Sequence, residues 1–354
     1  MIRTLITEAS PTAGEIMKRI LEADPEIEVV GLAKNGRECI EQVKRLKPNV
    51  ITMGINMPVM DGLEATRYIM ENMPTSILVV STLVKSDVDI TFKALKAGAL
   101  DVIGKPKIEK EINFNKIREE LIQKVKTVAR VRPFKKFNRS PVGAFISKSF
   151  ESGITISKNS DNESDKKRTG ILAIGASTGG PPVLHYILKR IPPEFPFPIV
   201  IAQHIARGFI EGLLEWLQKD CYLNVKIGKN NEYIKKGTVY LAPDKYHLGV
   251  TNGRKILLSD DPPISGHRPS VDFLMESVSS VCKNHCMGII LTGMGRDGAQ
   301  GMLTIKKSGG YTVSQDEKSS AIFGMPKAAI QTGAAMKVCP MNQIPSEIIK
   351  WVTG

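Results

Sequence analysis

Three reactive side chains in the C-terminal half of this chain each follow a short apolar segment. Ser177 lies in the motif Gly-Ala-Ser-Thr-Gly-Gly, His204 ends the stretch Ile-Val-Ile-Ala-Gln-His, and Asp297 ends the turn Gly-Met-Gly-Arg-Asp. A serine hydroxyl needs a neighbouring base to become nucleophilic, and an imidazole base needs a carboxylate to fix its tautomer. We therefore interpret Ser177, His204 and Asp297 as candidate catalytic residues of a serine hydrolase.

The glycine-rich loop 175–180 fits two functions when it is taken alone. A strand, a sharp glycine turn and a helix that opens with two prolines would expose the Ser177 hydroxyl and aim helix N–H groups at developing negative charge. The same features describe a loop that binds phosphate. This second hypothesis, a nucleotide- or phosphate-binding regulatory module, lacks a ribose-binding acid at the expected spacing and leaves His204 and Asp297 unexplained. We keep it as the alternative to the hydrolase.

Alternating strands and helices in residues 169–354 predict an α/β domain that brings the three residues together. Parallel strands present their carboxyl ends at one edge of the sheet, which is where ligands bind. The segment 224–260 fits a small antiparallel element beside this sheet. The expected strands are 171–174, 199–203, 239–242, 288–292 and 311–314, and the expected helices are 181–191, 208–218, 271–282, 298–307 and 326–331.

Residues 1–130 predict another α/β domain. Five short apolar strands that alternate with amphipathic helices are typical of a flavodoxin-like, doubly wound parallel sheet. The expected strands are 4–7, 28–32, 50–53, 77–81 and 101–103, and the expected helices are 12–23, 36–46, 63–72, 88–97 and 115–130, with Pro133 as the final stop.

Residues 131–168 are predicted to be a basic and polar linker between the two domains. Periodicity fades there, and 38 residues without an element would be improbable inside one domain. Residues 105–168 hold 17 Lys/Arg and 8 Asp/Glu, which accounts for most of the net charge of +13. Because no nucleic-acid-binding motif accompanies this charge, we interpret it as a solvated linker and expect no nucleic-acid partner.

Bulk features predict a folded protein of the cytoplasm. The sequence has no run of about 18 apolar residues, so we expect no membrane insertion. Its first residues lack the apolar region of a signal peptide. The five cysteines are scattered, and the group Cys282, His285 and Cys286 has no matching second cluster. We therefore predict neither a disulfide framework nor a metal site.

The N-terminal domain resembles the receiver domain of response regulators over nearly all of its length. Glu8-Ala9 stands where that family has an acidic pair that binds Mg²⁺, Gly54 at the phosphoacceptor aspartate, Ser81 at the switch hydroxyl, and Lys105 at the phosphate-contacting lysine. Glycine has no oxygen to phosphorylate, and Mg²⁺ requires several oxygen ligands. The resemblance therefore implies a degenerate receiver that is retained for docking or inhibition.

The chain from 170 to 353 resembles the chemotaxis-type protein-glutamate methylesterases, and the order of receiver then esterase covers the whole chain. The similar motifs are Gly-Ala-Ser177-Thr-Gly-Gly, Gln-His204, Val-Tyr-Leu-Ala-Pro-Asp-Lys-Tyr-His247, His267-Arg-Pro-Ser-Val-Asp and Gly-Met-Gly-Arg-Asp297-Gly. One difference is Ala-Arg after the motif histidine, where the family often has prolines.

The resemblance implies hydrolysis of glutamate γ-methyl esters on methyl-accepting chemoreceptors, and deamidation of receptor glutamines. Ser177 would be the nucleophile, His204 the base and Asp297 the residue that orients the base. The N–H of Met294 would form the oxyanion hole, with Thr178 placed to assist, and no cofactor is required. A histidine kinase or a signalling-array protein is the partner expected at the receiver. Which receptors are substrates, and how activity is controlled without the phosphoacceptor, stay open.

Overall fold

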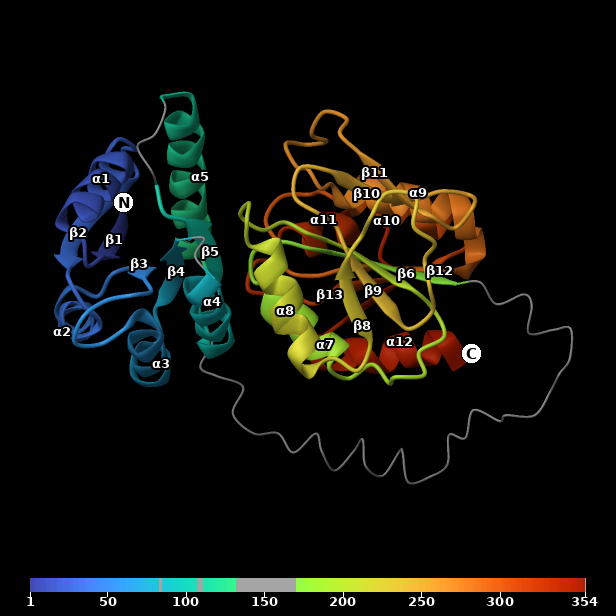
Figure 1. Ribbon diagram of the computed structural model, residues 1–354, viewed down its shortest axis with the longest axis horizontal. Helices are drawn as coiled ribbons and strands as arrows, with labels where there is room; N and C mark the ends of the chain where they lie inside the picture. The colour runs from blue at the N-terminus through green and yellow to red at the C-terminus, as the bar shows by residue number, and fades with distance from the viewer. Residues whose placement is uncertain (83–84, 107–110, 132–169, 354) are drawn as a thin grey trace, which may run out of the picture.

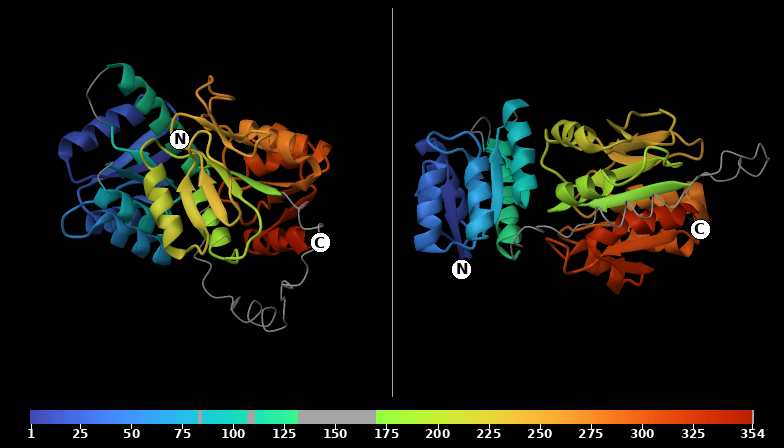
Figure 2. Two further views of the ribbon diagram at one scale, coloured as in Figure 1. Left: turned by 45° about the vertical axis from the view of Figure 1, so that its right-hand side comes forward. Right: turned by 90° about the horizontal axis from the view of Figure 1, so that it is seen from below.

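The computed structural model of the protein describes residues 1–82, 85–106, 111–131 and 170–353. These residues form two α/β domains that lie side by side in Figure 1 and in the right-hand view of Figure 2. Apart from Val131, the linker predicted over 131–168 lies outside the described residues, as does Pro133.

The N-terminal sheet has five parallel strands in the order β2-β1-β3-β4-β5. Flavodoxin-like doubly wound domains have this order, so the predicted fold class is confirmed for this half. The strands extend the expected ones by one or two residues at most ends: β1 Ile2–Thr7, β2 Ile27–Ala33, β3 Val50–Gly54, β4 Ser76–Ser81 and β5 Asp101–Gly104.

Five helices cover both faces of this sheet. The core residues of α1 and α5 pack on one face, and those of α2, α3 and α4 on the other. Side chains of Ser10, Asn35 and Asp61 cap the first three helices by accepting a backbone N–H. The last helix begins at Glu111 rather than at Asn115, because weak helix formers in its first turns hide its start in the sequence. The helices are α1 Pro11–Glu22, α2 Gly36–Leu46, α3 Gly62–Asn72, α4 Lys85–Ala97 and α5 Glu111–Ala129.

The C-terminal sheet has seven parallel strands in the order β14-β13-β12-β6-β7-β9-β8. Strand β6 lies between β12 and β7, so the three segments that precede the candidate catalytic residues are neighbours. A separate antiparallel pair, β10 and β11, supplies the small element expected within 224–260. The strands are β6 Ile171–Ala176, β7 Ile199–Gln203, β8 Asn224–Ile227, β9 Thr238–Leu241, β10 His247–Val250, β11 Ile256–Ser259, β12 Cys286–Ile290, β13 Tyr311–Gln315 and β14 Lys337–Cys339.

Helices cover both faces of the second sheet as well. Core residues of α7, α8 and α12 pack with alternate side chains of β6, and those of α9, α10 and α11 pack with the intervening ones. Sequence reasoning missed β14 and α12. Strand β14 has three residues with two of them exposed, and α12 carries Pro345 in its first turn. The helices are α7 Gly180–Leu188, α8 Ile210–Asp220, α9 Val271–Cys282, α10 Ala299–Lys307, α11 Met325–Gln331 and α12 Ile344–Thr353.

Helices α4 and α8 join the two domains through an apolar contact (Figure 1). Phe92, which is 1% exposed, stacks against Trp216 with ring centroids 5.5 Å apart. Gly212 lets the helices approach closely, because a Cβ at this position would lie 2.0 Å from Cγ1 of Val88. Ion pairs at the margins are Lys219–Asp89 and Lys96–Asp220. The two domains therefore share one continuous core cluster.

Candidate active site

The carboxyl ends of β6, β7 and β12 bring the three predicted residues to one edge of the sheet (Figure 1). The N–H of His204 donates to the carbonyl of Ala176 over 2.8 Å, and the N–H of Ser177 donates to the carbonyl of Thr292 over 3.0 Å. These two bonds connect the loops that follow β7 and β12 to the end of β6 and to the serine that follows it. The strand order thus brings the three residues to one edge, where a hydrogen bond joins His204 to Asp297 and none joins Ser177 to His204 among the described residues.

Asp297 binds His204 directly and is itself held by four donors. His204 Nε2 lies 2.9 Å from Oδ2 of Asp297, whose side chain has no exposed surface. The other donors are the Ser270 hydroxyl at 2.8 Å and the N–H groups of Val271 at 2.8 Å and Asp272 at 3.1 Å. Burial raises the pKa of Asp297, but the hydrogen bond and charge of His204, with the two N–H groups, outweigh it and bring the pKa to about 2. Asp297 is therefore an anion at neutral pH.

This arrangement fixes which nitrogen of His204 can act as the base. Because Asp297 is ionised, it can only accept, so Nε2 of His204 carries the proton that lies between them. The other nitrogen, Nδ1, is buried and has no hydrogen-bond partner among the described residues. Ser177 is 8% exposed, and its hydroxyl makes no hydrogen bond in the described part of the chain. Nδ1 is therefore the ring nitrogen of His204 that Asp297 does not engage.

Gln203 links the serine and histidine loops, a role that the sequence did not reveal. Its side-chain Nε2 donates to the carbonyl of Ser177 over 2.9 Å and to the carbonyl of His204 over 2.7 Å. The residue is 3% exposed. Gly180 makes room for it, because a Cβ there would lie 2.2 Å from Oε1 of Gln203. One buried amide therefore fixes the relative position of two candidate catalytic residues.

Two further histidines support the site. The ring of His267 stacks on His204 with centroids 4.0 Å apart and planes 6° apart. Burial, followed by the nearby charge of His204, lowers the pKa of His267 to about 4, so His267 is neutral at neutral pH. His247 accepts the N–H of Ser270 at Nδ1 over 3.1 Å and so steadies a donor to Asp297. In the sequence, both histidines stand out only as members of motifs similar to those of the methylesterases.

Ser270 is the second supporting residue that the sequence did not identify. It caps α9 by accepting the N–H of Phe273, and its own hydroxyl donates to Asp297. A serine before an apolar helix is a recognisable cap signal, but that signal does not tell which buried carboxylate the hydroxyl will meet.

The candidate oxyanion residues are Thr178, which follows the serine, and Met294, in the turn after β12. Gly293 lets the turn after β12 approach, because a Cβ at this position would lie 2.6 Å from the Cβ of Ser177. The N–H of Met294, the next residue, makes no hydrogen bond within the described ranges. The Thr178 hydroxyl donates to Asp101 of the other domain over 2.6 Å. The assignment of Met294 and Thr178 to an oxyanion hole stays a prediction.

The N-terminal domain places its four predicted pocket residues at the carboxyl edge of its own sheet. Lys105 Nζ pairs with Oε1 of Glu8 at 2.7 Å, and Glu8 is 6% exposed at its side chain. Gly54 is buried next to them, and a Cβ there would lie 3.4 Å from Oε2 of Glu8. The Ser81 hydroxyl accepts from Thr91 over 2.9 Å. The lysine and the acid of this pocket therefore neutralise each other.

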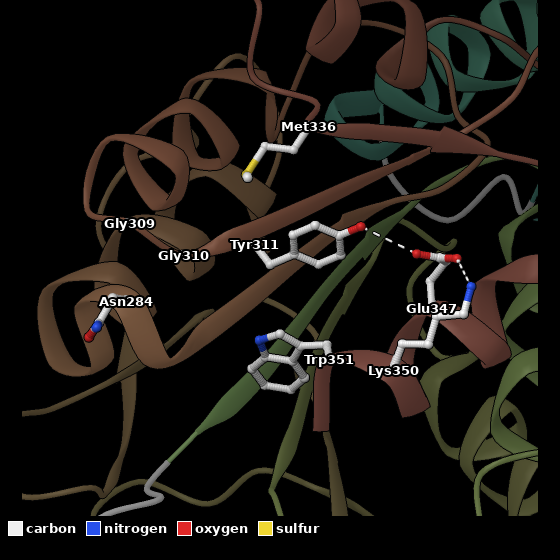
Figure 3. A pocket seen from close by; sticks show the side chains of 8 residues that line it. All are labelled: Asn284, Gly309, Gly310, Tyr311, Met336, Glu347, Lys350 and Trp351. Atoms are coloured by element: carbon white, nitrogen blue, oxygen red, sulfur yellow. Dashed lines mark hydrogen bonds and ion pairs between the residues drawn. The ribbon is translucent and has the colours of Figure 1, made fainter. Parts of the chain in front are cut away.

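A separate hollow of about 440 Å³ lies at the opposite edge of the C-terminal sheet, where β13 begins (Figure 3). Tyr311, Met336 and Trp351 supply its apolar wall. Its polar side chains bind one another, because Glu347 accepts from Lys350 at 3.0 Å and lies 3.3 Å from the Tyr311 hydroxyl. Nothing in this arrangement points to a ligand.

The cysteines and helices add two observations. All five cysteines are buried and none forms a disulfide, and no group of three metal-ligating side chains occurs among the residues the structure describes. None of the helices in the described ranges combines the length and apolar character that a membrane span requires.

Comparisons with known proteins match both halves of the chain. A family model described as CheB methylesterase matches residues 172–348, and one described as response regulator receiver domain matches residues 4–117. A protein-glutamate methylesterase/protein-glutamine glutaminase of Syntrophus aciditrophicus is 40% identical over 99% of this chain and 98% of the relative. One of Thermotoga maritima is 36% identical over 99% of both chains. The crystal structure of the Thermotoga maritima CheB methylesterase catalytic domain is similar with a TM-score of 0.50 and 38% identity, over 51% of this chain and 98% of that one.

Proposed function

Because this chain belongs to the CheB family of protein-glutamate methylesterases, with a receiver-type domain before the esterase domain, we propose that Ser177, His204 and Asp297 catalyse its reaction. The enzyme is a hydrolase of the protein-glutamate methylesterase/protein-glutamine glutaminase class. Its substrates are side-chain γ-methyl esters and amides of methyl-accepting chemoreceptors. The single observation that best supports the residue assignment is the 2.9 Å hydrogen bond between His204 and the fully buried carboxylate of Asp297.

In the first step, the Ser177 hydroxyl attacks the ester carbonyl. His204 takes the hydroxyl proton at Nδ1 while its Nε2–H stays bonded to the Asp297 carboxylate, which stabilises the imidazolium. The carbonyl oxygen becomes an oxyanion, for which the N–H of Met294 is the candidate donor. The intermediate then collapses, the proton on Nδ1 passes to the leaving oxygen, and methanol departs from the acyl-serine.

In the second step, water hydrolyses the acyl-serine with the same groups. His204 takes a proton from water, the hydroxide adds to the acyl carbon, and Ser177 leaves with the returned proton. The products are a glutamate side chain and the free enzyme. A glutamine amide passes through the same acyl-serine, with ammonia in place of methanol, which accounts for both activities in one site.

The alternative of a phosphate-binding loop is less consistent with the contacts of residues 175–180. A phosphate would need the N–H groups of the glycine turn. The N–H of Gly179 already donates to the carbonyl of Leu100 over 3.0 Å, and that of Gly180 to the carbonyl of Ser177 over 2.8 Å. The alternative also gives no role to the bond between His204 and Asp297. We therefore favour hydrolysis.

The direct test of the proposed substrate is methanol release from methylated receptors. Purified full-length protein is mixed with membranes that carry a chemoreceptor methylated with a radiolabelled methyl group, and volatile label is measured over time. We expect release that depends on the enzyme and that is absent with unmethylated receptor. Label that stays on every receptor tested, while the protein remains folded, would contradict the substrate assignment.

The proposed partners and location follow from this substrate. Chemoreceptor signalling helices are the macromolecular substrate, and a histidine kinase or an array protein is the partner proposed for the receiver-type domain. Since those helices are cytoplasmic, we place the enzyme in the cytoplasm. Five buried cysteines without a disulfide fit a reducing compartment.

We predict that phosphodonors do not activate this enzyme. Gly54 offers no oxygen for a phosphoryl group, and the lysine that would meet such a group is paired with Glu8 at 2.7 Å. Acetyl phosphate, or beryllofluoride with Mg²⁺, should therefore leave the rate of methyl-ester hydrolysis unchanged. The measurement is the initial rate with and without each reagent.

A relative with an aspartate at the matching position provides the positive control for the same reagents. Phosphodonor-dependent activation of this chain, with label retained on residues 1–130, would show that another carboxylate has taken over the role.

A further inference from the structure

The N-terminal domain contacts the loop that carries the nucleophile, at the two residues that follow Ser177. The carbonyl of Leu100 accepts the N–H of Gly179 over 3.0 Å, and Oδ2 of Asp101 accepts the hydroxyl of Thr178 over 2.6 Å. Leu100 and Asp101 stand at the start of β5, which faces the C-terminal domain beside α4 and α5 (Figure 1). Thr178 is 6% exposed.

The carboxylate of Asp101 is held in place by hydrogen bonds within its own domain. Its side chain is 6% exposed, and Oδ2 also accepts from Lys124 Nζ of α5 over 2.7 Å. The other oxygen, Oδ1, accepts the N–H of Val102 over 2.8 Å. Both oxygens are thus anchored within their own domain, so the carboxylate cannot follow Thr178 if that side chain rotates. A hydrogen bond to an ionised acceptor is about twice as strong as a neutral one.

A second contact reaches the other candidate oxyanion residue. The hydroxyl of Thr127, on α5, lies 2.7 Å from the sulfur of Met294. The same domain face therefore touches both residues proposed to bind the oxyanion. A domain that acted only as a steric cover over Ser177 would not need a carboxylate that accepts the hydroxyl of the neighbouring Thr178.

A threonine hydroxyl has one proton and can donate one strong hydrogen bond at a time. We propose that Asp101 is a positioning residue that withdraws the Thr178 hydroxyl from the oxyanion hole while the domains are docked. Release of this bond returns a donor to the transition state, and phosphorylation is not needed for it. This inference rests on the proposed function and on the prediction that Thr178 assists Met294 at the oxyanion.

The test is a double-mutant cycle on the full-length chain, with kcat and KM measured on a small γ-methyl ester of a glutamate derivative. Asp101→Ala should raise kcat by about tenfold, the factor expected for one recovered hydrogen bond. Thr178→Val should lower kcat less than about twofold in the wild type but about tenfold in the Asp101→Ala background. KM should change little in the cycle, because the bond acts on the transition state.

Two variants distinguish this proposal from the alternative that any weakening of the contact between the two domains raises kcat. Lys124→Met removes the same ion pair while it leaves the acceptor of Thr178 in place, so it should not raise kcat. If Asp101→Ala does not fold, Gly212→Ala serves instead, since its Cβ would clash with Val88 and separate the domains without touching either residue. Thr178→Val should again cost about tenfold in that background.

The outcomes are distinct. If Asp101→Ala raised kcat by the same factor in the wild type and in the Thr178→Val background, the proposal would be overturned. The N-terminal domain would then inhibit the esterase only by steric cover. A gain from Lys124→Met equal to that from Asp101→Ala would do the same. Failure of the proposed function looks different, because Ser177→Ala would then keep its activity in every background.

Discussion

Replacing Ser177 by alanine is expected to reduce kcat for methyl-ester hydrolysis by roughly four to six orders of magnitude. The hydroxyl is the only group in the site that can form the acyl intermediate, and the remaining donors cannot replace a nucleophile. The loop should keep its shape, because its bonds run through main-chain atoms: Ser177 N to Thr292, and Ser177 O to Gln203. Methanol release and thermal unfolding are measured on the same preparation.

Ser280→Ala is a matched control, since this exposed serine lies on α9 and its hydroxyl donates to the carbonyl of Ser277. It should hydrolyse the ester at the wild-type rate. A Ser177→Ala protein that released methanol at more than about one-hundredth of the wild-type rate would be incompatible with a covalent mechanism at this residue.

His204→Ala is expected to cost about as much as loss of the serine, because nucleophile and base act as one unit. Asp297→Asn should be milder, with a loss on the order of 10⁴-fold. An amide nitrogen that faces Nε2 would require that nitrogen to accept, so the proton would move to Nδ1 and the base would be lost from most molecules. His285→Ala, at an exposed histidine before β12, is the control and should leave kcat unchanged.

The order of these effects is as informative as their size. If Asp297→Asn were as active as the wild type, the bond between Asp297 and His204 would have no catalytic role. If His204→Ala retained most activity, a different base would have to be sought, and the stacked His267 would be the nearest imidazole.

Sequence reasoning predicted the strands that position Ser177, His204 and Asp297, because each residue follows a buried apolar run and parallel strands end at one edge. It also predicted a flavodoxin-like, doubly wound parallel sheet for residues 1–130. Contacts made by long-range packing were beyond it. Gln203 was recognised only as a motif neighbour, and the hydroxyl of Ser270 reaches Asp297 across 27 positions of sequence.

The contact between Asp101 and Thr178 shows the same limit more sharply. Neither residue carries a local signal for the other, since they lie 77 positions apart in different domains. Their contact depends on the close packing of α4 on α8, which Gly212 permits because it has no Cβ. Such packing arises only when both domains are folded. By contrast, the loss of the phosphoacceptor could be inferred at once from Gly54, because a missing side chain removes chemistry whatever the packing.

The most direct test of the central claim, a nucleophilic Ser177, is covalent labelling with a fluorophosphonate. The full-length protein is treated with the reagent, digested and examined by peptide mass spectrometry, while methanol release is followed on the same samples. We expect one adduct, on the peptide that contains Ser177, and a rate of methanol release that falls in proportion to the labelled fraction. A fully labelled protein that still releases methanol at the original rate, or an adduct confined to another serine, would contradict the account.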